Sequence, residues 1–289
     1  MAIRSSTQGE FKRVRSPLRG GGAGFLGARY ESLAVNGAPD STDSILALAL
    51  PKDVSLERFE QRQALLNLLD GRGGSLGDSF VTDLQRQALL LTGASARGGV
   101  PAFSVDRESE STRRKYGLHR FGQTMLMARR LAEAGVPMIA IHFNEMTICD
   151  GWDTHSKNFE ALKSELLPML DQSLSALIED LDQRGLLDET LVACFGEFGR
   201  TPKINANAGR DHWGECSSAL LAGGKIRRGM VLGSSDNFAA YPASDPVDPT
   251  DIHATLFHCL GVDPKQLIYD SLQRPFEVST GRVLSEILA

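Results

Sequence analysis

The chain has 289 residues, of which 42% are apolar and 23% charged, a composition typical of folded globular proteins rather than disordered ones. Its formal net charge of −5 argues against general nucleic-acid binding, because neutralising phosphates requires a basic surface. No run of about 18 apolar residues occurs, so the sequence predicts no membrane span.

Residues 1–19 are interpreted as a leader segment that precedes the folded domain. Residues 1–19 are basic and lack the apolar segment that a secretory signal needs, so we expect them to be disordered. Residues 20–289 are long enough for one large domain with its own core. Within that domain, residues 55–118 are interpreted as a helical insertion.

Apolar residues at helical spacing predict three helices in the first half of the chain. The third ends at Gly135, since a glycine commonly closes a helix. The ranges are 55–70, 79–92 and 119–134.

From residue 136 onward, short apolar runs rich in β-branched residues predict buried strands at 136–143, 190–195, 218–222 and 230–233. A long apolar stripe predicts a helix over 158–184 with a candidate kink at Pro168, and shorter helices are expected at 251–260 and 280–289. Because strand, long helix and strand follow one another, we predict an α/β fold with a mainly parallel sheet and helices on both faces.

Three polar clusters accompany these strands, at 150–155, 196–202 and 209–213. Sites in open α/β sheets form beyond the carboxyl ends of the strands. The first two clusters follow their strands and should share that rim. The third precedes its strand, so its place there is an added assumption.

The clusters contain oxygen and nitrogen ligands of the kind that zinc and manganese accept. Each also has a structural alternative, such as a helix-terminal charge for Asp153 or an ion pair with Arg210 for Asp211. For any single residue, a structural role and metal ligation are equally well supported, whereas the five residues taken together favour a metal site. The candidate ligands are Asp153, His155, Glu197, Asp211 and His212.

Three further residues are candidates for binding a substrate. The Arg200 guanidinium matches the geometry of phosphate or sulfate, although an ion pair with Glu197 is the alternative. Asn205 and Asn207 could orient a substrate or make turns. No GxSxG nucleophile motif occurs, so the catalytic nucleophile is unassigned.

The remaining histidines are assigned to structural positions. We expect His142 in the core or behind the ligands, and His258 as a buried residue. His119 and His253 are expected at surface or capping positions.

Long stretches of the sequence resemble the bacterial family catalogued as domain of unknown function 1501, abundant in planctomycetes. The resemblance covers roughly residues 18–288 and is most specific over 190–213. It is carried by GWDTHSKNF, LDQRGLLDETLVACFGEFGRTPKINANAGRDHW, LLAGGKIRRGMVLGSSD, YPASDPVDPTDIHATLFHCLGVDP, GGGAGFLGARYESLAVNG and RRKYGLHRFGQTMLMARRLAEAGVPMIAIHF.

That family is grouped with the sulfatase and alkaline-phosphatase-like superfamily, whose enzymes use two metal ions to activate a nucleophile. Asp153 and His155 resemble the superfamily's ligand pair for one metal, and His212 its later single histidine. Glu197 occupies the position where the superfamily usually has Asp followed by His, and here Phe198 follows it. The sequence therefore departs from the superfamily pattern at the ligands of the second metal.

The resemblance implies a metal-dependent hydrolase of sulfate or phosphate esters, with a small anionic ester as substrate. The implied cofactor is one or two divalent ions of zinc, manganese or calcium. The alternative is a non-catalytic binding or surface-associated protein on the same scaffold. The sequence leaves the oligomeric state open.

Superfamily members carry the nucleophile and a metal-binding Asp on an early strand and helix, and family members usually begin with a twin-arginine export signal. No such segment precedes Gly20. The resemblance therefore implies an alkaline-phosphatase-like fold that is incomplete at the N-terminus, and a chain impaired as an enzyme.

Overall fold

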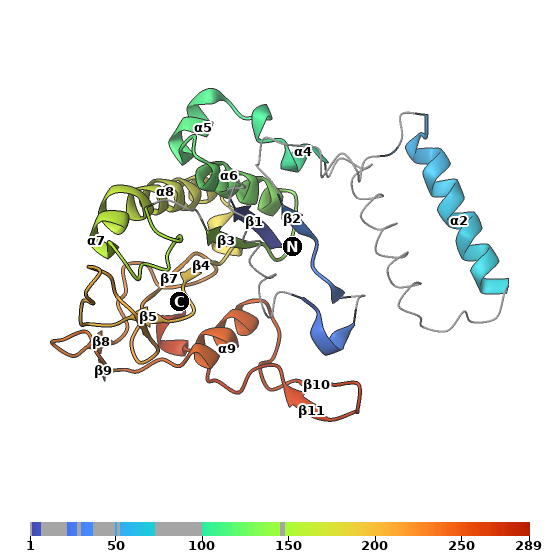
Figure 1. Ribbon diagram of the computed structural model, residues 1–289. Coiled ribbons are helices and arrows are strands. Elements are labelled where there is room, and N and C mark those ends of the chain that lie inside the picture. The colour runs from blue at the N-terminus through green and yellow to red at the C-terminus, as the bar shows by residue number, and fades with distance from the viewer. Residues whose placement is uncertain are drawn as a thin grey trace. The chain divides into compact units, whose positions relative to one another are not determined.

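The computed structural model describes residues 2–6, 22–27, 30–36, 50, 53–72, 100–144 and 148–289 (Figure 1). The chain divides into two compact units, Met1–Glu145 and Met146–Ala289. None of the helices in the described part combines the length and apolar character that a bilayer crossing requires. The helix predicted over 79–92 lies outside the described residues.

The first unit contains a small parallel sheet. Strand β1 (Ala2–Ser6) lies between β2 (Ala34–Asn36) and β3 (Ala140–Asn144), and Ala2 pairs with both Ala34 and Ala140. Residues 2–6 of the predicted leader thus form a strand, whose backbone groups pair with two neighbouring strands. Residues 7–19 lie outside the described residues.

Helix α6 (Arg120–Glu133) provides the core of the first unit. Its Leu126 and Leu131 are fully buried, and Phe121 stacks on Phe143 of β3 with ring centroids 3.7 Å apart. Gly135 follows the helix with a φ of 82°, and the two hydrogen bonds of a Schellman motif close it. The other helical elements among the described residues of this unit are η1 (Gly24–Leu26), α2 (Leu56–Arg72), α4 (Val100–Phe103), η4 (Val105–Arg107) and α5 (Glu110–Tyr116).

A buried arginine joins α6 to the segment before it. The Arg129 side chain is only 1% exposed, and it forms ion pairs with Glu108 at 2.8 Å and Glu133 at 2.6 Å. Arg130 also pairs with Glu108. Burial alone would raise the pKa of Glu108, but the hydrogen bonds and charges of the two arginines outweigh it and lower that pKa below its ordinary value.

The first helical stretch of the second unit is continuous and is formed by α7 (Asn158–Ala161), a π-helical turn η5 (Leu162–Leu166) and α8 (Leu167–Gln183). Pro168 is the second residue after the π turn, following Leu167. A proline ring collides with the carbonyl four residues earlier in a regular α-helix, and the wider turn relieves that contact.

The rest of the second unit consists of short antiparallel strand pairs and helix α9 (Pro249–Cys259), shown in orange and red in Figure 1. Val192 and Phe195, the ends of β4, pair with Ala222 and Ala219, the ends of β7. The elements are η6 (Leu187–Glu189), β4 (Val192–Phe195), β5 (Gly199–Arg200), β6 (His212–Trp213), β7 (Ala219–Ala222), β8 (Ser234–Ser235), β9 (Pro242–Ser244), β10 (Leu267–Tyr269), β11 (Pro275–Glu277) and η7 (Ser285–Ile287).

The predicted α/β fold with a mainly parallel sheet and helices on both faces is wrong. Strands β3 and β4, predicted as parallel neighbours, belong to different sheets, and the strand pairs of the second unit are antiparallel and two to four residues long. Among the described residues, parallel pairing is confined to the three strands of the first unit. Apolar runs indicate buried strands but do not specify partner or direction.

Two predicted elements near the C-terminus also differ. Residues 230–233 form no strand, and Val231 is 86% exposed, so the apolar run there is not a core segment. The helix predicted over 280–289 is reduced to the 3₁₀ turn η7.

Candidate metal centre

The site is built on a short hairpin. Strands β5 and β6 pair so that Arg200 lies opposite His212 and Gly199 opposite Trp213. A Cβ on Gly199 would lie 1.8 Å from the Cys216 carbonyl oxygen, so only glycine fits at this crossing. The hairpin thereby places two predicted site residues side by side.

A second loop, residues 153–158, is fastened to the hairpin loop 201–211 by backbone hydrogen bonds. The amides of Lys157 and Asn158 donate to the carbonyls of Asn207 and Ala208, and the Arg210 amide donates to the Thr154 carbonyl. Because these groups are fixed by the chain itself, the positions of Asp153 and His155 relative to His212 follow from the backbone.

Three ligand atoms converge where the loops meet. Nε2 of His155 lies 3.1 Å from Nε2 of His212 and 3.1 Å from Oδ1 of Asp153, and the His212 nitrogen lies 2.9 Å from the same oxygen. The two histidine side chains are 45% and 50% exposed and that of Asp153 is 31% exposed, so the group lies at the surface of its unit. These three residues could hold a metal ion.

The triangle fits the spacing of ligands around a first-row metal. Ligand atoms about 2.1 Å from an ion lie about 3.0 Å apart on an octahedral face and about 3.4 Å apart in a tetrahedron. The observed edges of 2.9–3.1 Å match the octahedral value, and a tetrahedral ion would need them to widen by about 0.3–0.5 Å. Two nitrogens and one oxygen suit zinc or manganese better than calcium, which takes oxygen ligands.

The hydrogen-bond partner of His155 indicates where its ring proton lies. Its Nδ1 lies 2.9 Å from Oδ1 of Asp211, and a carboxylate only accepts, so Nδ1 carries a proton. A neutral His155 then points an Nε2 lone pair at the Asp153 oxygen.

Electrostatics keep both carboxyl groups ionised. Burial would raise the pKa of Asp153, but hydrogen bonds from His212 and Arg200, with the nearby positive charges, lower it below its ordinary value. Hydrogen bonds from His155 and Asn205 lower the pKa of Asp211.

Arg200 lies beside the triad, and its ion pair is with Asp153 rather than with Glu197. Its Nη2 donates to Oδ1 of Asp153 and to the Trp152 carbonyl, both at 2.8 Å, and its Nη1 donates to the Arg210 carbonyl at 3.3 Å. The guanidinium therefore holds the two loops together.

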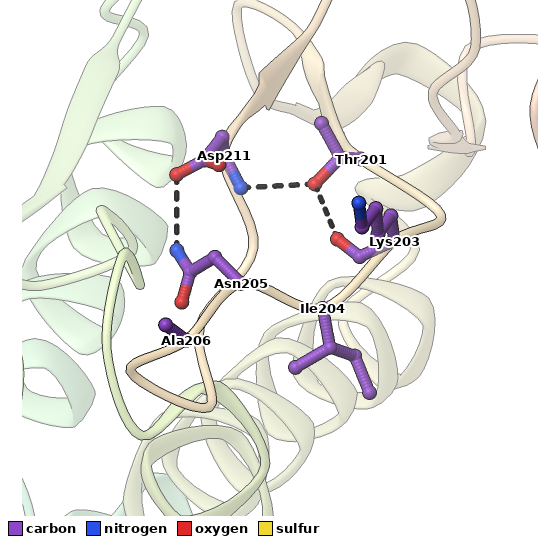
Figure 2. A pocket seen from close by; sticks show the side chains of 6 residues that line it. All are labelled: Thr201, Lys203, Ile204, Asn205, Ala206 and Asp211. Atoms are coloured by element: carbon purple, nitrogen blue, oxygen red, sulfur yellow. Dashed lines mark hydrogen bonds between the residues drawn. The ribbon is translucent and has the colours of Figure 1, made fainter.

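Asn205 also links the loops 153–158 and 201–211. Its amide nitrogen donates to the His155 carbonyl and to Oδ1 of Asp211, both at 3.0 Å, while its oxygen accepts from the amides of Asn207 and Gly209. Asn207 itself lies in the turn that this asparagine closes. Asn205 and Asp211 also line an open hollow of about 330 Å³ with Thr201, Lys203, Ile204 and Ala206 (Figure 2).

Two of the five predicted ligands lie outside the group whose ligand atoms converge. Asp211 contacts His155 on the far ring nitrogen, and Glu197 is exposed and belongs to no such group among the described residues. Sequence reasoning did not foresee that the Phe198 ring packs on His212, with centroids 4.2 Å apart. An aromatic residue directly before the hairpin was the available signal.

Of the other histidines, His119 caps helix α6 by accepting a hydrogen bond from the Gly122 amide, which confirms the expected capping position. His258 is exposed, so the expectation that it is buried is wrong. His253 is exposed on α9, as expected for a surface position.

The comparison with family models settles the family. A model described as "Protein of unknown function (DUF1501)" matches residues 3–288. The chain belongs to the DUF1501 family. A search of the curated proteins found no match, and a search of the solved structures found none either. Membership of DUF1501 assigns no activity, so function must be argued from the site itself.

Proposed function

We propose that this DUF1501 protein binds one divalent metal ion through Asp153, His155 and His212 and uses it to hydrolyse a small sulfate or phosphate ester. The observation that carries the proposal is the convergence of one carboxylate oxygen and two imidazole nitrogens within 3.1 Å of one another. Zinc or manganese is the cofactor expected from the donor set.

A bound ion would supply Lewis-acid polarisation of an ester oxygen. The protein's part is to hold three ligands on one side and leave the other side accessible. The half-exposed histidines support that division, since a closed structural site would surround the ion with four protein ligands. Phe198 packs on His212 and limits the rotation of that ring.

Metal binding is tested first. The full chain is dialysed against a chelator, and zinc and manganese are titrated by calorimetry. We expect one ion per chain, and loss of at least tenfold in affinity for His212→Ala. His253→Ala, an exposed histidine on α9, is the matched control and should bind as the wild type does. Equal binding by all three proteins would overturn the metal centre.

Hydrolysis is tested separately with aryl sulfates and aryl phosphates. Turnover that requires added metal and disappears in His155→Ala supports the hydrolase proposal. Metal binding without turnover of either ester class would reject it and leave the metal centre standing.

A non-catalytic metal-binding role is the second candidate, and one observation favours it. Arg200 directs its donors at Asp153, Trp152 and Arg210 within the protein. An arginine so engaged stabilises the loops but has little left to offer an anionic substrate.

A further inference from the structure

The two histidines of the centre differ at their second ring nitrogen. Nδ1 of His155 meets the Asp211 carboxylate at 2.9 Å. The hydrogen bonds of the His212 ring among the described residues are made by Nε2, and the Phe198 ring packs against the imidazole with centroids 4.2 Å apart. One ligand is thus oriented by a hydrogen bond and the other by an aromatic contact.

The contact between Asp211 and His155 determines which nitrogen can bind a cation. A neutral imidazole carries its proton on one nitrogen and a lone pair on the other. A carboxylate at Nδ1 holds the proton there, so the lone pair lies on Nε2, the atom that faces Asp153 and His212. Without Asp211 the two tautomers of His155 would compete, and one of them cannot bind the ion.

Asp211 is itself held in place from two directions, as Figure 2 shows. Its Oδ1 accepts from Asn205 Nδ2 at 3.0 Å, and its backbone amide donates to Thr201 Oγ1, also at 3.0 Å. The Thr201 hydroxyl in turn donates to the Lys203 carbonyl at 2.8 Å. The carboxylate is therefore fixed even though its side chain is 56% exposed.

We propose that Asp211 is a positioning residue of the metal centre, which orients His155 as an Nε2 ligand without touching the ion. The proposal rests on the metal-binding function proposed above. It assigns Asp211 to the layer behind the ligands, where a carboxylate fixes the tautomer and the ring orientation of a metal-binding histidine.

The test uses zinc alone, titrated into the full-length wild type, Asp211→Ala, Asp211→Asn and His155→Ala. Losing an outer carboxylate typically weakens metal binding about 10–100-fold, and we expect that range for Asp211→Ala. Asp211→Asn keeps an oxygen that accepts from Nδ1 and should recover part of the loss. Asp188→Ala removes a carboxylate that is 92% exposed and is the matched control.

A second measurement reads the tautomer directly. Nitrogen-15 NMR of the imidazole in the metal-free protein should show His155 protonated at Nδ1 in the wild type and a tautomer mixture in Asp211→Ala. A merely structural role would leave this signature unchanged, and circular dichroism confirms that each variant is folded.

The outcomes separate the two proposals. Zinc binding that His155→Ala abolishes and Asp211→Ala leaves unchanged would overturn the positioning role but not the metal centre. Absence of zinc binding by the wild type would overturn both. A loss of 100-fold or more in Asp211→Asn as well as in Asp211→Ala, equal to that of His155→Ala, would make Asp211 a ligand and also reject the positioning role.

Discussion

Gly209 lies so close to His155 that a Cβ at this position would be 2.0 Å from the His155 carbonyl oxygen and 2.5 Å from the amide nitrogen of Ser156. The backbones of the two loops of the candidate metal centre are in direct contact here. The glycine is required because any side chain would push His155 away from its partners.

Gly209→Ala should therefore separate the loops. We expect a loss of about 1–3 kcal/mol in the free energy of unfolding, typical of overpacking, together with a loss of at least tenfold in zinc affinity. Gly214→Ala, in the same region but with no atom within 4 Å of its Cβ position, is the control and should leave both unchanged. Urea unfolding and zinc titration measure the two effects, and wild-type affinity in Gly209→Ala would contradict the close approach.

Asn205→Asp tests the hydrogen bonds that join the loops. The substitution keeps the shape but replaces the amide donor with an acceptor that faces the Asp211 carboxylate and the His155 carbonyl. We expect about 1 kcal/mol of destabilisation, since the His155 carbonyl loses its hydrogen-bond donor. Asn237→Asp adds the same charge at an exposed position and controls for it. Equal urea midpoints for the two variants would show that Asn205 does not hold the loops.

Glu108→Gln tests the buried arginine of the first unit. Arg129, almost fully buried, loses its closest charged partner outside α6, and breaking such a pair costs about 3 kcal/mol. Glu110→Gln removes an exposed carboxylate paired with Arg114 and should cost less than about 1 kcal/mol. Thermal melting followed by circular dichroism compares the two, and a similar shift for both would contradict the prediction.

His119 should make the first unit sensitive to mild acid. Burial lowers the pKa of this histidine, so between its folded and unfolded pKa values the unfolded chain binds more protons. The stabilisation is therefore complete above the ordinary value of about 6.5 and is lost as pH falls through the lower folded value. Protonation of Nδ1 also removes the acceptor that caps α6.

His119→Asn keeps a capping side chain that does not titrate. The difference in urea stability between the wild type and this variant should change from pH 8 to pH 5, with the wild type losing more. His253→Asn, at an exposed position, should show no such difference. A constant gap between wild type and His119→Asn across this range would sink the prediction.

Much of the local structure could be predicted from the sequence. The spacing of apolar residues located α6, and Gly135 marked its end, because these signals lie within one segment. Strands β4 and β7 were located as well, but their antiparallel pairing depends on the loop between them. Whether two strands pair parallel or antiparallel depends on the chain between them, so the apolar pattern of each strand does not predict it.

The candidate site divides in the same way. Residue type and clustering pointed to Asp153, His155 and His212, whose ligand atoms do converge. The roles of Arg200 and Asn205 could not be foreseen, because each hydrogen-bonds to a residue about 50 positions away. Such contacts exist only after the loops have met.

The contact between Asp153 and His212 spans 59 positions of the chain. Closing a loop of this length lowers the conformational entropy of the chain before the contacts that offset this cost have formed. If zinc binds at the proposed centre, a zinc-sensitive dye present during refolding should therefore report binding only after the loops 153–158 and 201–211 have met.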